Sequence, residues 1–349
     1  PFPCGMAGGF LLEIRRGTQS ALLVIRYSPV DVSVAADRLE VRSGGSCEAA
    51  ALPAGVRLAP SSCRGLQRLP GGGLHLRTGL RRPPPHVVFT LRESLKPQKN
   101  YVFYCQSCGD IIVKDRKFLR VLPLPSENWS ALIEEWCCHP NPFARSTLHP
   151  QHDDCFLGDT FFLLNSGKES HVSESPMCCS EGGHHASQSD TIKYYVTEVI
   201  IRPSEGSFTP TPRSQFIQSM VAQCLVELSS AKSTFRFAVK GDNGKSYILM
   251  WLLNSDTLLV ESSGSSSSHS VFTLFGDIFM PSSGPVGTWN AVKVLYQPCI
   301  KSRNKDLADA WEDDIGVHPL KFPSETCLEL LLILSLSTSS LNFIKFRLE

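Results

Sequence analysis

Two cysteines separated by two residues are the part of this sequence best suited to metal chemistry. Cys105 and Cys108 lie in the run Tyr-Cys-Gln-Ser-Cys-Gly, and Gly109 follows the second thiol. Thiolates at this spacing can bind one tetrahedral zinc ion, and a glycine permits the left-handed backbone that such a knuckle needs. The β-like residues 100–104 and 111–114 place both thiols at the tip of a hairpin. The sequence therefore predicts half of a zinc site.

Completing that site needs further ligands, and the sequence leaves their identity open. A second cysteine pair commonly follows about 15–20 residues later, whereas the next thiols here are the adjacent Cys137 and Cys138. Residues 149–155 also gather groups that could bind a metal, although ionic and capping roles are favoured for the acidic pair among them. The further candidates are Cys155, Cys179, His185, His149, His152, Asp153 and Asp154.

A short helix is predicted over residues 126–136, where apolar residues recur at helical spacing and Ser126 can cap the first turn. The recurring residues are Trp129, Leu132, Ile133 and Trp136. This helix would place Cys137 and Cys138 at its C-terminal end. The partial negative charge there raises a thiol pKa and disfavours a free nucleophile, so a role as metal ligand fits these cysteines better.

Two more helices are predicted in the second half of the chain. One runs from Ser214 to Leu228, and its apolar residues share one face. The other runs over about residues 324–334, with Thr326 and Glu329 spaced as a capping box. Cys327 lies in its first turn, where the helix dipole can lower a thiol pKa. Cys327 could therefore accept an acyl group in thioester exchange, while a small buried apolar side chain is the more common role.

The charge balance argues against a general nucleic-acid or membrane surface. The 349 residues include 34 Lys and Arg against 33 Asp and Glu, a net charge of +1. A zinc-ribbon nucleic-acid binder would need a basic stripe, which the sequence lacks. The clearest basic group, Arg77, Arg81 and Arg82, precedes a run of prolines and indicates a solvated loop rather than a phosphate site. We expect neither direct nucleic-acid binding nor a membrane partner.

The cysteines indicate a reducing compartment. The chain has 13 of them, an odd number that includes two adjacent pairs, which makes a poor disulfide framework. No signal peptide is visible, and no apolar run approaches the length of about 20 residues that spans a bilayer. We expect a cytoplasmic protein, with the nucleus as a further location. Met6 resembles a natural start, with residues 1–5 as an upstream extension.

Several long runs of this sequence resemble one protein family. The runs are Ser61 to Gln67, Tyr104 to Gly109, Val121 to Trp129, Leu252 to Asp256, Val294 to Arg303 and Thr326 to Ser335. They are similar to the HECT-like ubiquitin ligases that bind ubiquitin-conjugating enzymes (E2s), in the vertebrate form. The resemblance implies a ligase that accepts ubiquitin from an E2, notably the one serving the anaphase-promoting complex. It also suggests cyclin B as a substrate.

The same resemblance implies where the E2 binds. In the family the contact matches about Arg202 to Cys224, which covers an extended segment and the helix that follows it. The apolar face of that helix could equally be core. We therefore expect an exposed Phe216, together with Pro210 and Pro212, to make the E2 contact.

A second, different activity is also implied by the resemblance. Relatives are linked to the stability of the pre-mRNA 3′-end processing endonuclease, a zinc enzyme of the metallo-β-lactamase type. The run Trp136-Cys137-Cys138-His139-Pro140 resembles a motif that occupies the metal centre of such nucleases, with Cys138 as the ligand. Trp129, Trp136 and His139 would then contact the nuclease. The alternative function is thus a non-catalytic adaptor that holds this enzyme.

The chain departs from the family in two places. Relatives have a further Cys-x-x-Cys pair after the segment that matches Cys178-Cys179, whereas here Gly183 is followed by only a short polar stretch before Thr191. The partner pair expected for Cys105 and Cys108 is therefore missing, as in an isoform. The tail after Leu336 also diverges.

Together these observations predict an α+β fold in four parts. Residues 6–125 form a β-rich N-terminal domain with the zinc half-site, and residues 126–158 hold the nuclease-binding helix and Cys-Cys-His motif. Residues 159–192 are a flexible linker. Residues 193–349 form a mixed α/β, HECT-like domain with the E2-binding region at about 202–224.

Overall fold

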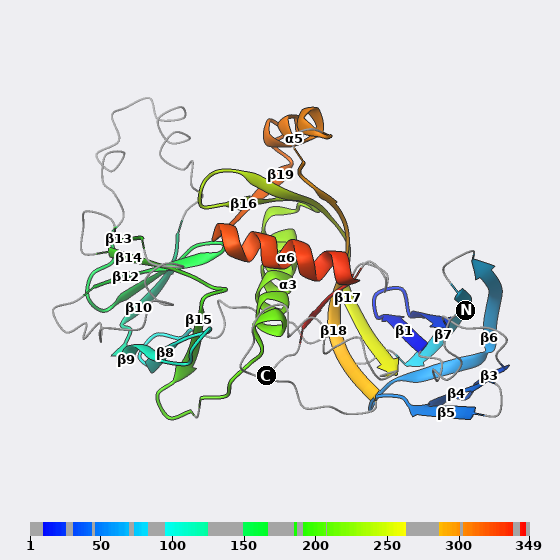
Figure 1. The fold of residues 1–349 in the computed structure, drawn as a ribbon. Coiled ribbons are helices and arrows are strands. Elements are labelled where there is room, and N and C mark those ends of the chain that lie inside the picture. Colours follow the sequence, from blue (N-terminus) through cyan, green and yellow to red (C-terminus); the bar gives the residue numbers. More distant parts are fainter. Residues whose placement is uncertain are drawn as a thin grey trace.

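The computed structural model describes residues 10–25, 31–43, 46–69, 73–82, 95–124, 149–166, 185–186, 191–206, 208–262, 286–300, 303–337 and 343–346. Over these residues the fold is α+β, with three helices and twenty strands in four sheets (Figure 1). The predicted fold class is confirmed at this level. Among the described helices, none has the length and apolar character needed to cross a membrane.

The largest sheet contains strands from both ends of the chain. Its strands are β1 (Phe10–Arg15), β2 (Ser20–Ile25), β6 (Arg57–Leu69), β7 (Gly73–Arg82), β16 (Arg236–Gly241), β17 (Ser246–Ser262), β18 (Val286–Pro298), β19 (Val317–Phe322) and β20 (Phe343–Phe346). The order is β19-β16-β17-β1-β2-β7-β6, with β18 beside β17 and β20 beside β18. Strand β17 joins the two halves, because its first part pairs with β16 and its second part pairs with β1.

The remaining strands form three smaller sheets. One consists of β3 (Asp31–Val34), β4 (Arg38–Ser43) and β5 (Ser46–Ala51), and another of β8 (Asn100–Cys105), β9 (Ile111–Lys117) and β15 (Val199–Pro203). The third consists of β10 (Arg120–Pro123), β11 (Asp154–Leu157), β12 (Phe161–Asn165), β13 (His185–Ala186) and β14 (Thr191–Tyr195). Strand β12 lies at the centre of this sheet, within the segment expected to be a linker.

The helices differ in part from their predicted limits. Helix α3 extends over Arg213–Lys232 and α6 over Ser324–Ser337, so both continue beyond the predicted ends. The residue before α3 is Pro212, and Ser214 is buried inside the helix rather than capping it. Helix α5, Lys305–Glu312, was not predicted, although Leu307, Ala310 and Trp311 recur at helical spacing; none of its residues is buried.

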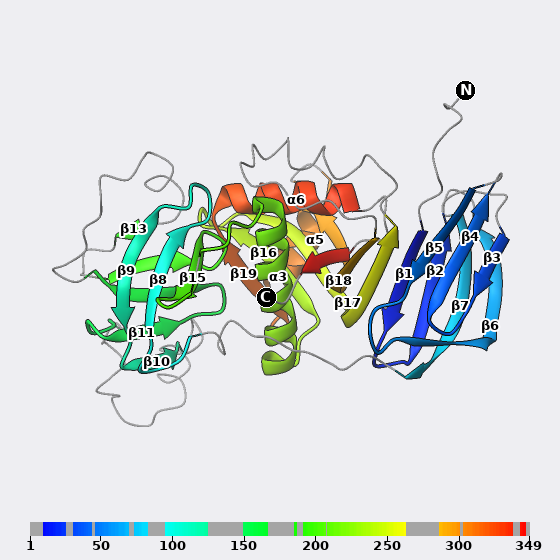
Figure 2. The ribbon, with the colours of Figure 1, turned by 90° about the horizontal axis from the view of Figure 1, so that it is seen from below.

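The buried side chains form two main cores. One lies among the strands of residues 10–80 and includes Leu258 and Val260 from β17. The other contains residues 95–334 and buries α3 and α6 together with β8, β12, β16 and β17. In Figures 1 and 2 the N-terminal strands occupy one end of the molecule, strands β8 to β15 the opposite end, and α3 and α6 the region between them. The β8–β9 hairpin therefore packs with the C-terminal half.

One predicted loop is a strand. Arg77, Arg81 and Arg82 lie on β7, which pairs with β2 on one side and with β6 on the other. The prediction of a solvated loop was wrong, because the prolines that suggested it follow the strand instead of interrupting it.

Candidate functional site

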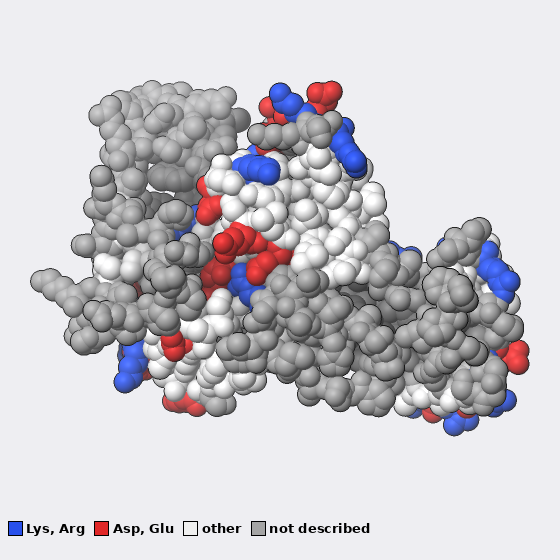
Figure 3. Space-filling model, in the orientation of Figure 1, with Lys and Arg blue, Asp and Glu red and all other residues white. Residues whose placement is uncertain are grey.

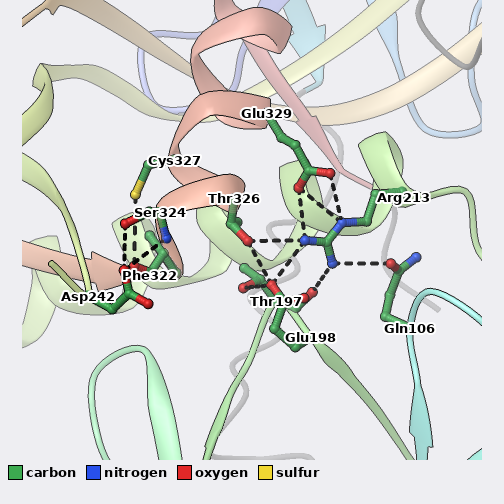
Figure 4. Close-up of polar contacts among 10 residues, drawn as sticks. All are labelled: Gln106, Thr197, Glu198, Arg213, Asp242, Phe322, Ser324, Thr326, Cys327 and Glu329. Atoms are coloured by element: carbon green, nitrogen blue, oxygen red, sulfur yellow. Dashed lines mark hydrogen bonds and ion pairs between the residues drawn. The ribbon is translucent and has the colours of Figure 1, made fainter. Parts of the chain in front are cut away.

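The side chain of Arg213, the first residue of α3, joins segments that are far apart in the sequence (Figure 4). Its Nη2 atom lies 3.0 Å from Glu198 Oε1 and 2.8 Å from Glu329 Oε2. Its Nη1 atom donates hydrogen bonds to the main-chain oxygen of Thr197 at 2.7 Å and to Gln106 Oε1 at 3.2 Å. Arg213 thus connects the tip of the β8–β9 hairpin, the turn before β15, and helices α3 and α6.

Thr326 completes this group of polar residues. Its hydroxyl accepts a hydrogen bond from Arg213 Nη2 at 3.1 Å and donates one to Glu198 Oε1 at 2.7 Å. We call the group the Arg213 cluster, and its members are Gln106, Thr197, Glu198, Arg213, Thr326 and Glu329. Figure 3 shows acidic and basic atoms side by side over the first half of α6.

The Arg213 cluster holds one cation between two carboxylates in a largely buried position. Burial alone would lower the pKa of Arg213, but the charges of Glu198 and Glu329 and the hydrogen bonds to them raise it. Burial raises the pKa of Glu329, and this effect exceeds the lowering caused by Arg213. Arg213 therefore stays charged, whereas Glu329 takes up a proton more readily than an ordinary glutamate.

Cys327 follows Thr326 in the first turn of α6 and is fully buried. Burial raises the pKa of its thiol to about 12, and the nearby Asp242 carboxylate adds to that rise. The Sγ atom lies 3.9 Å from the main-chain oxygen of Phe322. The expectation that the helix dipole lowers this pKa was wrong. Burial destabilises the thiolate more than the helix N-terminus stabilises it, so the net shift of the pKa is upward. In this conformation the thiol is protonated and closed to a reaction partner.

The predicted capping box at the start of α6 is also wrong. Helix α6 begins at Ser324, which puts Thr326 inside the first turn instead of at the cap position. The side chains of Thr326 and Glu329 both turn to Arg213. The spacing of these residues serves the Arg213 cluster, and Ser324 instead hydrogen bonds to the carboxylate of Asp242.

The hairpin expected around Cys105 and Cys108 is confirmed as strands β8 and β9. Cys105 is buried and Cys108 is half-buried at the turn, where its Sγ atom lies 3.3 Å from Asp110 Oδ2. Gly109 has a φ of +82°, the left-handed conformation for which glycine was expected. No group of three or more His, Cys, Asp or Glu side chains that could hold a metal occurs within the described residues. Two thiols alone do not make a closed zinc site, so the zinc knuckle stays a prediction.

The other proposed metal ligands of residues 149–155 make polar contacts within the protein. Asp154 pairs with Arg120 at 2.7 Å, and His152 Nδ1 lies 2.7 Å from Asp153 Oδ1. His149 Nδ1 lies 3.1 Å from the hydroxyl of Thr191. Cys155 is buried on β11, and burial raises the pKa of its thiol to about 12. The ionic role favoured for the acidic pair fits these contacts.

The segment expected to bind the E2 rests on the β8–β9 hairpin. Strand β15 pairs with β8, and the rings of Tyr104 and Phe208 lie 4.6 Å apart. Gln106 Nε2 donates a hydrogen bond to the main-chain oxygen of Thr211 at 3.0 Å. These contacts hold residues 208–212 in an extended conformation directly before Arg213.

Exposure within this segment differs from expectation at two of the three named residues. Pro210 is exposed, as expected, but Pro212 is buried and Phe216 is only 8% exposed. The apolar face of α3 belongs to the core, because the helix packs against α6 and against β17, β18 and β20 of the large sheet. The exposed part is the stretch of residues 203–206 with Thr209 and Pro210.

Several predicted site residues lie outside the described part of the chain. They are Trp129, Trp136, Cys137, Cys138, His139 and Cys179. His185 lies on the short strand β13, which pairs with β14.

Sequence reasoning did not find the Arg213 cluster. A signal was present, because an arginine at the first position of a helix opposes the positive end of the helix dipole and needs acidic partners. The partners Glu198 and Glu329 are 15 and 116 residues away from it in the sequence, and only the fold brings them together.

Comparison with known proteins identifies the class. The family model of HECT-like ubiquitin-conjugating enzyme (E2)-binding proteins matches residues 13–341, so the chain belongs to this family. It is an E3 ubiquitin-protein ligase of the HECT-like kind. No solved structure matches the chain.

The similarity extends over nearly the whole length of the relatives. The chain is 54% identical to a mouse protein named as an E3 ubiquitin-protein ligase over 342 residues, which cover 95% of this chain and 92% of the relative. It is 48% identical to the human protein of the same name over 363 residues, with 95% and 93% covered. The bovine protein of that name is 49% identical over 363 residues, with the same coverage.

Proposed function

We propose that this ligase receives ubiquitin from an E2 bound at the extended segment that precedes α3, residues 203–206 and 208–211, and that Cys327 is the acceptor thiol. The observation that carries the proposal is the Arg213 cluster. It bonds Arg213, which begins α3 directly after this segment, to Thr326 and Glu329, which flank Cys327 on α6. A partner that binds residues 208–211 and displaces Arg213 would therefore act on the first turn of α6, which contains Cys327.

Transfer requires that Cys327 become accessible, since its thiol is closed in this conformation. Displacement of Arg213 would leave Glu198 and Glu329 facing each other without their shared cation. The repulsion and burial of these two carboxylates favour movement of the first turn of α6. E2 binding and exposure of the acceptor would thus be linked through one side chain.

The covalent steps follow ordinary thioester exchange. The Cys327 thiol gives up its proton to solvent and its thiolate attacks the carbonyl carbon of the E2–ubiquitin thioester. A new thioester forms, the bond to the E2 sulfur breaks, and the E2 leaves as a thiolate that takes up a proton from solvent. A substrate lysine amine then attacks the Cys327 thioester, which forms an amide and returns the Cys327 thiol. Cyclin B is the substrate we propose, on the resemblance of the chain to its family.

An E2 discharge assay on non-reducing gels tests the acceptor. We expect a ubiquitin adduct, sensitive to reducing agent, that Cys327→Ala abolishes. Cys155→Ala is the matched control, because Cys155 is equally buried and its thiol pKa is also raised to about 12. An adduct that persists in Cys327→Ala and disappears with another cysteine would assign the acceptor elsewhere.

E2 binding is tested separately on the exposed segment. Pro210→Arg should weaken E2 binding about tenfold or more, because it changes an exposed contact without touching the core. Pro319→Arg, at an exposed proline of β19, is the control and should bind normally. Phe216→Ala should lower the stability of the protein and leave E2 affinity unchanged in the molecules that fold. Normal binding by Pro210→Arg would move the contact away from this segment.

The burial of Cys327 also favours a second candidate function, that of a non-catalytic adaptor. In this role Cys138 would enter the metal centre of the pre-mRNA 3′-end processing nuclease, with Trp129, Trp136 and His139 beside it. Cys138→Ala should abolish nuclease binding in pull-downs while leaving the melting temperature unchanged, and Cys137→Ala should be milder. A large fall in melting temperature for Cys138→Ala would instead indicate an internal ligand.

Zinc remains part of the proposal. Cys105 and Cys108 would supply two thiolates at the hairpin tip, with further ligands from Cys179 or His185. We expect less than one zinc per chain by metal analysis, and a further loss in Cys108→Ser. One full zinc that survives Cys108→Ser would remove the hairpin from the site.

A further inference from the structure

The hairpin of β6 and β7 carries arginines that the ubiquitin reaction does not use. Arg64, Arg68, Arg77 and Arg81 are exposed, and none forms an ion pair with another described residue. Arginines of the neighbouring segments behave differently, since each lies within ion-pair distance of a carboxylate. They are Arg15, Arg16, Arg38, Arg42 and Arg57. Among the described residues of this end of the molecule, the unpaired arginines are therefore confined to one hairpin.

The sequence provides no acid to neutralise this hairpin locally. No Asp or Glu occurs between Glu48 and Glu93. In the strand register Arg64 lies directly opposite Arg77. Like charges in facing positions of an antiparallel pair are destabilising. A chain with a net charge of only +1 thus concentrates positive charge here at some cost to its own stability.

Protection of a sheet edge does not account for all of these arginines. Strand β6 is the edge of the large sheet as described, and charged side chains on an edge strand discourage unwanted pairing. This role could explain Arg64 and Arg68 on β6. It does not explain Arg77 and Arg81, because β7 is an interior strand between β2 and β6.

We propose that the β6–β7 hairpin binds an acidic segment of a partner protein in extended conformation. The segment would pair with the edge of β6, which no other described strand covers, and place carboxylates against Arg64 and Arg77, which face each other in the register. The half of β6 beyond Gly65 is the part best suited to pairing, because the bulge at Gly65, with a φ of +67°, lies before it.

A polypeptide fits this surface better than a nucleic acid. Residues 57–82 contain no Phe, Tyr or Trp on which bases could stack. Leu66 is 63% exposed between Arg64 and Arg68 and offers an apolar contact to a peptide side chain. An edge strand also offers backbone donors and acceptors, which a second polypeptide strand can match.

The test uses the full chain and a fluorescein-labelled peptide of alternating Glu and Val, followed by fluorescence anisotropy. We expect binding that weakens with added salt. Arg64→Glu with Arg77→Glu should weaken it about tenfold or more. Arg303→Glu with Lys305→Glu reverses two exposed charges elsewhere and should leave it unchanged. If the first pair of reversals impairs folding, Arg64→Gln with Arg77→Gln replaces it and should weaken binding in the same direction.

Two further probes complete the test. The same peptide with N-methyl groups on alternate residues cannot pair with an edge strand, and we expect it to bind much more weakly. Equal binding of the methylated peptide, or binding that the charge reversals leave unchanged, would overturn the proposal. So would an oligothymidine that binds more tightly than the peptide and is lost in the Arg64/Arg77 variant.

Discussion

The Arg213 cluster joins two regions, the start of α6 and the tip of the β8–β9 hairpin, in which Cys327 and Cys108 differ in burial. At the start of α6, Cys327 is fully buried, and burial raises its thiol pKa to about 12. At the tip of the β8–β9 hairpin, Cys108 is half-buried and lies next to an acidic side chain. A position in the first turn of a helix therefore does not make a thiol reactive by itself, because burial has the larger effect.

The largest expected change in stability follows substitution of Arg213, the residue that joins the two regions. Arg213→Met should lower the free energy of unfolding by about 3 kcal/mol, because it leaves two partly buried carboxylates without their cation. Arg236→Met is the control, since the pair of Arg236 with Asp314 is about one third exposed and should contribute at most about 1 kcal/mol. Urea denaturation of both variants checks the difference. Equal losses would show that the cluster does not hold α3 to α6.

The next largest change in stability should distinguish Cys327 from Cys108. Cys327→Ser should cost about 1–3 kcal/mol, because it puts a hydroxyl into an apolar, buried position. Cys108→Ser should cost much less, because its side chain lies at the surface of the turn. Melting temperatures of the two variants measure this. Equal losses for the two variants would contradict the difference in burial between the two side chains.

Chemical labelling should rank the thiols in the same order. With iodoacetamide near neutral pH we expect Cys108 to be modified well before Cys327, since only a thiolate in contact with solvent reacts. Cys155, as buried as Cys327, serves as the internal reference. Peptide mass spectrometry over time gives the rates. Modification of Cys327 as fast as Cys108 would contradict the closed state of α6.

The smallest effect is the pH dependence that Glu329 contributes. Its pKa in the folded protein is raised above 4.5, mainly by burial. The stability it contributes is therefore present at low pH and is lost as the pH rises through the folded pKa. We expect the stability of native protein relative to Glu329→Gln to fall as the pH rises from about 4.5. Urea denaturation at a series of pH values measures this, and a difference that stays constant or rises with pH would contradict it.

Local sequence patterns predicted several of the elements but not how they pack together. The hairpin around Cys105 and Cys108 and the helices near Ser214 and Ser324 follow from turn residues and apolar spacing, and the structure has all of them. The large sheet could not be predicted, because β17 pairs with β1 across more than 240 residues of sequence. Strand register of that kind depends on packing between distant segments.

The candidate site, like the fold, could be predicted from the sequence only in part. Resemblance to the family indicated residues 202–224, and the place of Cys327 in the first turn of a predicted helix indicated that thiol. Neither pattern predicted which individual side chains are exposed. Phe216 was expected to be exposed to a partner, and it is buried instead. Conversely, Arg213 and Glu329 are separated by 116 residues in the sequence, and only the packing of α3 against α6 brings them together.

The central claim is that E2 binding opens the buried thiol of Cys327 through Arg213. It is tested most directly by labelling Cys327 with iodoacetamide in the presence and absence of an E2 joined to ubiquitin by a stable oxyester. Our account predicts that this E2 accelerates modification of Cys327 while Cys155 stays protected, and that Pro210→Arg removes the acceleration. Unchanged protection of Cys327 in an E2 complex that still transfers ubiquitin would contradict it.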